Sequence, residues 1–151
     1  MKYKITILIL AFSTLIALFS FKSDPSQYCK DEKTYYSLEE ALKNPLEVKK
    51  LDIAMQKLTS IPPEIGKLEN LECLDLSFNK ISNLPEEIKN LKKLKYLNLC
   101  GTRYLSGVPE ILKNLQSLEC LDISDHPEWS KDKFEKAKIM LPNVKLITIS
   151  N

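Results

Sequence analysis

Leu71-Glu72-Cys73-Leu74-Asp75-Leu76 is the stretch that decides the fold, because its apolar leucines stand at the first, fourth and sixth positions. The same pattern occurs 23 residues earlier, in residues 48–53, and 23 residues later, in residues 94–99. After one inserted residue it appears a fourth time, in residues 118–123. Alternation of apolar and polar residues is typical of a strand with one buried side. The four blocks are therefore predicted to be equivalent strands.

The residues between the blocks repeat as well. The first three blocks are each followed by an aliphatic residue and a proline, at Ile61-Pro62, Leu84-Pro85 and Val108-Pro109. Proline ends a strand and favours the start of a helical turn, and the spacing from Ile65 to Leu68 puts two aliphatic residues on one face of that turn. One unit cannot bury this face alone. Neighbouring units are expected to stack, with parallel strands about 4.8 Å apart.

This arrangement, L-x-x-L-x-L-x-x-N-x-L followed by x-x-L-P, is the leucine-rich-repeat pattern. It predicts an α/β fold, a short right-handed leucine-rich-repeat solenoid with parallel strands on the concave face and helical turns on the convex face. The repeat domain spans residues 48–151. It is divided into units 48–70, 71–93, 94–117 and 118–143 and a closing strand at residues 144–149.

Both ends of the repeat domain are predicted to carry a helix. Ser37 can cap an N-terminal capping helix within residues 35–47, which Pro45 ends. At the other end, Ser130 can cap a closing helix that runs to about Met140. The closing strand is then expected to align Leu141, Val144, Ile147 and Ile149 with Leu91, Leu94, Leu97 and Leu99.

The N-terminus has the layout of a secretory signal peptide. A basic start at Lys2 and Lys4 precedes an uncharged apolar run, residues 5–21. Residues 1–20 are therefore predicted to be a signal peptide, and the alternative is an uncleaved membrane anchor formed by residues 5–21. Residues 21–34 are expected to be a flexible linker. The protein is thus predicted to be secreted, periplasmic or on the cell surface, and to contact a membrane only through an uncleaved N-terminal segment.

Four segments carry a family resemblance: residues 37–42, residues 48–53 with Gln56, residues 61–68 and residues 141–144. In these segments the chain resembles bacterial extracytoplasmic leucine-rich-repeat proteins of the kind common in spirochaetes and Bacteroidetes. The resemblance implies a protein-binding role, in some members at host or cell surfaces.

The polar residue inside the turn departs from the family pattern. The usual asparagine occurs only as Asn79, and Gln56, Thr102 and His126 take the equivalent places. Glutamine and threonine side chains can still form hydrogen bonds there. The polar ladder between units is therefore predicted to be uneven.

Exposed strand positions are expected to form columns across the concave face. The second-position column alternates in charge, which favours a solvated salt ladder that supports strand pairing; the alternative is a recognition stripe. The third-position column is less polar than a solvated face needs, and Phe78 lies near it, which favours a contact patch for a partner. The alternative is that these side chains pack on each other or against a terminal cap. The second-position column reads Lys49, Glu72, Lys95, Glu119 and Lys145, and the third-position column reads Lys50, Cys73, Tyr96, Cys120 and Leu146.

The fifth-position column is rich in aspartate. Carboxylates on neighbouring strands can hold a hard cation. Aspartate is however ordinary at this position of the repeat, so we predict no metal site and expect these residues to surround the contact patch. The column reads Asp52, Asp75, Asn98, Asp122 and Thr148.

The four cysteines do not suggest two internal disulfides. Cys73 and Cys120 fall two strands apart, so their α-carbons are expected to be about 9–10 Å apart. A disulfide needs less than about 7 Å. Cys100 lies further along its strand than either of them, and the pattern does not place Cys29. We predict at least two free thiols.

These features favour a non-catalytic protein- or peptide-binding module that acts outside the cytoplasm through its concave face, without a cofactor. No phosphate-binding loop or metal-ligand motif is present. The formal net charge of +2 stems from Lys2 and Lys4, so nucleic acid is not an expected partner. The alternatives are a structural or self-associating envelope protein, a carbohydrate-binding surface protein, and a hydrolase that uses Cys100 and His126. The candidate contact residues are Lys50, Asp52, Cys73, Asp75, Phe78, Tyr96, Asn98, Cys120 and Asp122.

Overall fold

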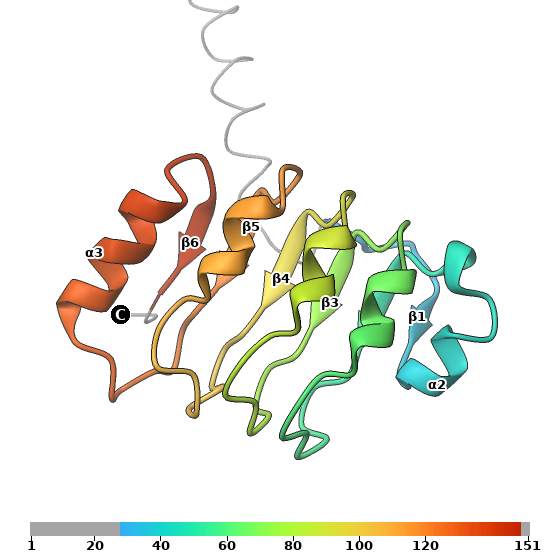
Figure 1. Ribbon diagram of the computed structural model, residues 1–151, viewed down its shortest axis with the longest axis horizontal. Coiled ribbons are helices and arrows are strands. Elements are labelled where there is room, and N and C mark those ends of the chain that lie inside the picture. Colours follow the sequence, from blue (N-terminus) through green and yellow to red (C-terminus); the bar gives the residue numbers. More distant parts are fainter. Residues whose placement is uncertain (1–27, 149–151) are drawn as a thin grey trace, which may run out of the picture.

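A parallel sheet of six strands forms the centre of the structure, a computed structural model that describes residues 28–148. The strands follow one another in space in the order of the sequence. Figure 1 shows them side by side, with short helices on one side of the sheet. The predicted signal peptide, residues 1–20, lies outside the described residues. The strands are β1 (Thr34–Tyr35), β2 (Lys50–Asp52), β3 (Cys73–Asp75), β4 (Tyr96–Asn98), β5 (Cys120–Asp122) and β6 (Lys145–Ile147).

The predicted helical turns are present as 3-10 helices on the convex side. Each begins directly after the proline of its unit, where the preset φ of proline favours a helical start. Each is closed by a leucine whose N–H donates to a carbonyl three residues earlier, at 3.1 Å in all three turns. These helices are η4 (Pro63–Lys67), η5 (Glu86–Asn90) and η6 (Glu110–Asn114).

A ladder of leucines between the two layers forms the core. Leu51, Leu74, Leu97 and Leu121 are neighbours across the sheet, and each is at most 1% exposed. Aliphatic side chains of the turns pack against this ladder from the convex side. Burial of one leucine side chain contributes about 1.5–3 kcal/mol. The predicted stacking of units around a shared core is thus confirmed for the middle of the chain.

The N-terminal end of the sheet differs from the prediction. Strand β1, which the repeat pattern does not contain, pairs in parallel with β2. The helix expected within residues 35–47 is reduced to α2 (Leu38–Ala41), and the 3-10 helix η3 (Pro45–Glu47) follows it. Pro45 disfavours helical backbone in the residue before it, so α2 cannot continue into η3. Ser37 caps α2 as predicted, since its side chain accepts a hydrogen bond from the N–H of Glu40 at 3.4 Å.

The C-terminal helix has the predicted bounds. It is α3 (Lys131–Met140), and it is the last helix on the convex side (Figure 1). Ser130 stands at its N-cap but makes no side-chain capping bond. Within residues 28–148, no helix combines the length and the apolar character that crossing a membrane requires.

The predicted register of the closing strand is wrong by one residue. The structure pairs Cys120 with Lys145 and Leu121 with Leu146, whereas the repeat alignment placed Leu146 beside Cys120. In the observed register Leu146 packs against the core, and Lys145 remains exposed. Packing of Leu146 against the core therefore outweighs the spacing of the preceding leucines. Ile147, rather than Thr148, continues the fifth-position column beside Asp122.

The polar residues inside the turns bind the backbone in different ways, which confirms the predicted uneven ladder. The Nδ2 group of Asn79 donates to the carbonyl of Ile53 in the preceding unit at 2.8 Å. The hydroxyl of Thr102 donates instead to Leu99 of its own unit, at 2.6 Å. Gln56 reaches the backbone that follows β1. Only the asparagine has both a donor and an acceptor placed between neighbouring units.

Candidate functional site

Residues 28–33, which we call the N-terminal strap, lie against the concave side of the sheet. A disulfide joins Cys29 to Cys73 of β3, with their α-carbons 6.3 Å apart. Tyr28 stacks on Tyr96 of β4, with 6.1 Å between the ring centroids and 4° between the planes. The strap is therefore tied to the sheet. Residues 21–34 were predicted to be a flexible linker, and for residues 28–34, which the structure describes, this prediction is wrong.

The strap changes the predicted contact patch. Cys73 and Cys120 are buried, so neither offers a surface to a partner. Tyr96 is partly buried with Tyr28 stacked on it, and Lys50 donates from Nζ to the carbonyl of Cys29 at 3.4 Å. The third-position column thus packs against a terminal segment of the same chain. This is the alternative that the sequence left open for this column, and the repeat pattern could not decide it because the strap lies outside the repeat.

Two thiols are free in the described chain, as predicted: those of Cys100 and Cys120. Burial raises the pKa of the Cys120 thiol to about 11, although the neighbouring Lys145 opposes the shift. Burial also raises the pKa of the Cys100 thiol above its ordinary value. Because the thiolate is the reactive form of cysteine, neither side chain is activated as a nucleophile.

We expect alkylation without reductant to modify two cysteines in two separate phases. Cys100 is partly exposed and should react first, whereas Cys120 is buried and should react more slowly. The slow phase should accelerate as the pH rises toward about 11, the pKa of Cys120. Intact-mass analysis over time measures both phases. If all four cysteines were modified in the native, unreduced protein, the disulfide would be contradicted. If no cysteine were modified, the two free thiols would be contradicted.

The second-position column forms ion pairs between neighbouring segments. Lys95 pairs with Glu72, and Lys49 pairs with Glu32 of the strap at 2.9 Å. The Lys49–Glu32 pair is exposed and the Lys95–Glu72 pair is partly exposed, so each contributes at most about 1 kcal/mol. These two pairs agree with the predicted salt ladder, although Glu32 lies one residue before the position that the β1–β2 register places opposite Lys49.

The fifth-position column closes each strand with the same hydrogen bond. The side-chain Oδ1 atoms of Asp52, Asp75, Asn98 and Asp122 accept from the backbone N–H two residues later, at 2.8–3.1 Å. In addition, Nδ2 of Asn98 donates to Oδ2 of Asp75 at 2.8 Å. An Asx turn of this kind needs a side-chain oxygen and no charge, because Asn98 makes the same bond. The Asx turn therefore explains why aspartate or asparagine stands at the fifth position, but it does not explain why three of the four residues are charged.

The three aspartates of the fifth position are partly exposed to solvent. Within residues 28–148, no ion pair involves Asp52, Asp75 or Asp122. Together with burial, the carboxylates of Asp122 and Asp75 raise the pKa of the Tyr96 hydroxyl far above its ordinary value. The described residues contain no group of three or more potential ligands placed to hold a metal ion. A cavity of about 290 Å³ adjoins the carboxylates and is lined by Cys29, Lys50, Asp52, Cys73, Asp75 and Tyr96.

The eighth position of every unit has left-handed backbone. Met55, Phe78, Gly101 and Asp125 have φ angles between 54° and 64°. Glycine and aspartate tolerate this conformation, whereas methionine and phenylalanine adopt it at a cost of about 1–3 kcal/mol. The Phe78 ring lies against Gly101, where an added Cβ would be only 2.6 Å from the ring. Phe78 and Met55 nevertheless remain 50% and 74% exposed.

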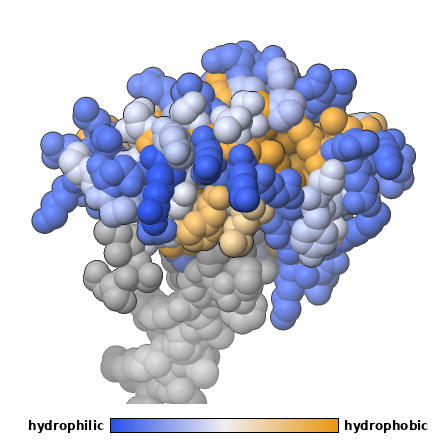
Figure 2. All heavy atoms as spheres, turned by 90° about the horizontal axis from the view of Figure 1, so that it is seen from below, coloured by the Kyte–Doolittle hydropathy of each residue, from blue (hydrophilic) through white to orange (hydrophobic). Residues whose placement is uncertain are grey.

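Acidic and apolar side chains meet where the strands end. We call this region the strand-end surface: the aspartates of the fifth position with Asn98, together with Tyr36, Met55 and Phe78. Tyr36 directly follows β1 and is 64% exposed. Figure 2 views the molecule from the side on which the strands end, and hydrophobic residues gather there between hydrophilic ones. Five predicted contact residues belong to this surface: Asp52, Asp75, Phe78, Asn98 and Asp122.

Sequence reasoning missed two residues of the strand-end surface. Met55 occupies the same position of its unit as Phe78, so the repeat alignment contains the signal for it. Tyr36 precedes the repeat, and only the pairing of β1 with β2 brings it to the same edge. Of the four remaining predicted residues, Lys50, Cys73 and Tyr96 line the adjoining cavity, and Cys120 is buried.

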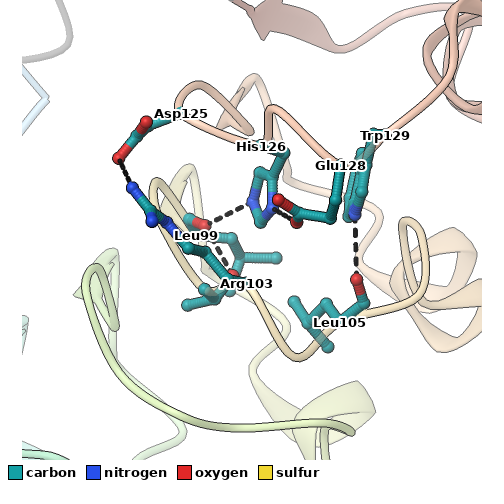
Figure 3. A network of polar contacts seen from close by, with 8 residues as sticks. Leu99, Arg103, Leu105, Asp125, His126, Glu128 and Trp129 are labelled. Carbon is teal, nitrogen blue, oxygen red and sulfur yellow. Dashed lines mark hydrogen bonds and ion pairs between the residues drawn. The ribbon is translucent and has the colours of Figure 1, made fainter.

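The side chain of His126 is held in place by two polar contacts and a stacked ring. Its Nε2 donates to the carbonyl of Leu99 at 3.0 Å, and its Nδ1 lies 3.2 Å from Oε1 of Glu128 (Figure 3). The ring stacks on Trp129, with 4.1 Å between centroids, and Trp129 donates from Nε1 to the carbonyl of Leu105 at 2.8 Å. Both ring nitrogens are thus occupied by groups other than a thiol. This arrangement does not support the hydrolase alternative that paired His126 with Cys100.

Comparison with known proteins agrees with this architecture. A leucine-rich-repeat protein of Leptospira interrogans has a similar solved structure, with 27% sequence identity and a TM-score of 0.50. The match covers 78% of this chain but 35% of that protein, so the chain spans about a third of its length. No curated protein matches the chain.

The leucine-rich repeat region family matches residues 26–145, which is most of the chain. Leucine-rich-repeat domains generally mediate protein binding and are typically non-catalytic. From the repeat pattern, the parallel sheet and this match together, we conclude that the chain belongs to the leucine-rich repeat region family.

Proposed function

We propose that the protein is a non-catalytic module that binds a protein or peptide partner outside the cytoplasm through its strand-end surface. One observation carries the proposal: three exposed apolar side chains lie beside three carboxylates that have no basic partner in the described chain. Exposed aromatic and methionine side chains are enriched at protein interfaces. Unpaired charge at the same place supplies orientation and partner choice.

The charge of the surface favours a basic partner. Asp52 and Asp75 are neighbours across the sheet, and both line the cavity of about 290 Å³. A lysine or arginine side chain that enters this cavity meets two carboxylates and the ring of Tyr96, which can contact its aliphatic stem. Lys50 also lines the cavity, where its ammonium donates to the carbonyl of Cys29, so the two carboxylates outnumber the resident cation. We therefore expect a partner segment with a basic residue flanked by apolar residues. The apolar residues would contact Met55 and Phe78.

Two features support action outside the cytoplasm. The Cys29–Cys73 disulfide is of a kind that persists in oxidising compartments and is rare in the cytosol. The basic start and apolar run of residues 1–20 have the layout of a secretory signal peptide. Export of the protein, with cleavage after this segment or retention of it as an anchor, belongs to the proposal.

The proposal is tested by capturing a partner from an extract of the producing cells with the immobilised full chain, followed by measurement of its affinity. In the test variant Asp52, Asp75 and Asp122 are replaced by asparagine. Asparagine keeps the Asx-turn bond, as Asn98 shows, and removes only the charge. We expect the variant to bind at least ten-fold more weakly, which corresponds to about 1.4 kcal/mol or more.

The matched control removes three carboxylates from exposed convex positions by the changes Glu64→Gln, Glu69→Gln and Glu86→Gln. Its affinity should equal that of the unmodified protein. A second variant, Met55→Ser with Phe78→Ser, should also weaken binding, because it removes the apolar contacts. Equal binding by all of these proteins, or a partner whose bound segment is acidic, would refute the strand-end surface as the recognition site.

A further inference from the structure

A groove on the convex side separates the last 3-10 turn from the C-terminal helix. Its volume is about 540 Å³, and η6 and α3 form its two walls. These elements are neighbours at the C-terminal end of the convex layer in Figure 1. The groove does not share a residue with the strand-end surface. Its lining is formed by Ser106, Gly107, Val108, Glu110, Lys113, Lys133, Lys136, Ala137, Ile139 and Met140.

The groove exists because the regular packing of turns stops here. Between η4 and η5 the backbones are close: a Cβ on Gly66 would lie 2.8 Å from Cβ of Glu87. Gly107 lies in the loop before η6 and lines the groove, and a Cβ there would have no heavy atom within 4 Å apart from its chain neighbours. The ten-residue helix α3 takes the place of a fourth 3-10 turn, and it leaves space beside η6 that the regular turns fill.

The lining of the groove is apolar between basic side chains. Val108 and Met140, both partly exposed, supply apolar surface, and Ile139 is 79% exposed at its side. An aliphatic side chain this exposed on a helix gains nothing from the core of its own chain. Contact with a second molecule would remove its surface from water, which is favourable at about 25 cal/mol per Å².

The charge of the groove is positive. The one acidic side chain of the lining, Glu110, pairs with Lys113 at 3.0 Å. Lys133 and Lys136 stand on the α3 wall, and within residues 28–148 no ion pair involves either of them. Two lysine charges are therefore left for a ligand. A ligand that complements this groove carries negative charge beside an aliphatic or aromatic group.

We propose that the groove between η6 and α3 is a second docking site, which takes an acidic segment of a partner protein with one large apolar anchor side chain. The anchor lies in the groove beside Val108 and Met140, and the carboxylates of the segment pair with Lys133 and Lys136. A volume of about 540 Å³ suits a few side chains of a peptide. The two docking sites thus differ in sign, since the strand-end surface is acidic.

A displayed library of random 12-residue peptides tests this proposal, with selection against the full chain and counter-selection against the variant Lys133→Glu with Lys136→Glu. We expect the enriched peptides to carry net negative charge and a leucine, isoleucine or phenylalanine. Synthetic copies should bind the charge-reversed variant at least ten-fold more weakly than the unmodified protein. The control variant, Lys67→Glu with Lys80→Glu, makes the same change of charge elsewhere and should bind the peptides unchanged.

A second variant tests the place of binding by shape alone. In Gly107→Trp a large side chain is added at the lining of the groove, where an added Cβ meets no other atom, so we expect it to obstruct the groove without disturbing the fold. Circular dichroism with thermal melting checks that the fold is kept. The selected peptides should lose binding to this variant, and Ile139→Ser, which alters an exposed residue, should weaken binding several-fold. Enrichment of neutral or basic peptides, undiminished binding to Gly107→Trp, or no peptide that distinguishes the unmodified from the charge-reversed protein would overturn the proposal.

Discussion

Replacing Cys29 and Cys73 by serine is expected to lower the free energy of unfolding by about 4 kcal/mol. The disulfide joins residues separated by 44 positions, and closing a loop of this length removes conformational entropy from the unfolded chain, which the chain-entropy relation puts at about 4 kcal/mol. The double variant also loses the attachment of the strap, because the disulfide holds residues 28–33 against the sheet. The stacking of Tyr28 on Tyr96 depends on the same attachment.

Urea denaturation of the unmodified protein and of this double variant, both without reductant, measures the difference. The unmodified protein treated with a dithiol reductant should unfold at the same urea concentration as the double variant. Cys100→Ser is the matched control, since it removes a thiol that forms no disulfide, and it should change stability by less than about 0.5 kcal/mol. Equal stability of the double variant and the unmodified protein would mean that the strap is not attached as described.

Replacing Asn79 by alanine is expected to lower the free energy of unfolding by about 3 kcal/mol. The side chain is 3% exposed. Its Oδ1 accepts from the N–H groups of Gln56 and Leu58 at 3.1 and 3.0 Å, and its Nδ2 donates to the carbonyls of Ile53 and Leu76. Alanine leaves these backbone groups without a partner, and each buried polar group left unsatisfied costs about 1–3 kcal/mol. Water that enters the turn can bind some of these backbone groups and so offset part of the loss of stability.

Thr102→Val provides the comparison for Asn79→Ala. Thr102 occupies the equivalent place one unit later, is fully buried, and donates a single side-chain hydrogen bond, to Leu99. Its replacement should cost about 1 kcal/mol. Denaturant unfolding of both variants measures the two losses of stability, which can then be compared. A loss at Asn79 no greater than the loss at Thr102 would contradict the role of Asn79 as the link between two units.

The fold of the middle units could be predicted because their local and global signals agree. The leucines at the fourth position recur every 23 residues, and this spacing alone sets the register that pairs Leu51, Leu74 and Leu97. The prolines before η4, η5 and η6 mark where each turn begins. Each middle unit packs against its neighbour in the same way, so the structure of one unit predicts that of the next.

The ends could not be predicted in the same way, because the repeat does not reach them. The short strand β1 and the strap have no counterpart in the repeated pattern, so nothing in the spacing placed Cys29 opposite Cys73. In β6 the spacing of the leucines predicted the wrong register, and the observed pairing packs the partly buried Leu146 against the core. Long-range contacts made by a single copy of a sequence leave no periodic signal.

The candidate site was predictable to the extent that it belongs to the repeat. The acidic column and Phe78 were identified because they recur at fixed positions of the units. The third-position column was misjudged, since its accessibility depends on the strap and not on the strands. The surface that remains for a partner therefore shifts from the middle of the sheet to the strand ends.

Hydrogen–deuterium exchange of the full chain, with and without the captured partner, tests the central claim most directly. If the strand-end surface is the recognition site, the partner should slow the exchange of backbone amides in residues 52–57, 75–80 and 98–104. The convex turns η4 and η5 should exchange at unchanged rates. Protection confined to the convex side, whether at these turns or in the groove between η6 and α3, with free exchange at the strand ends, would contradict recognition through the strand-end surface.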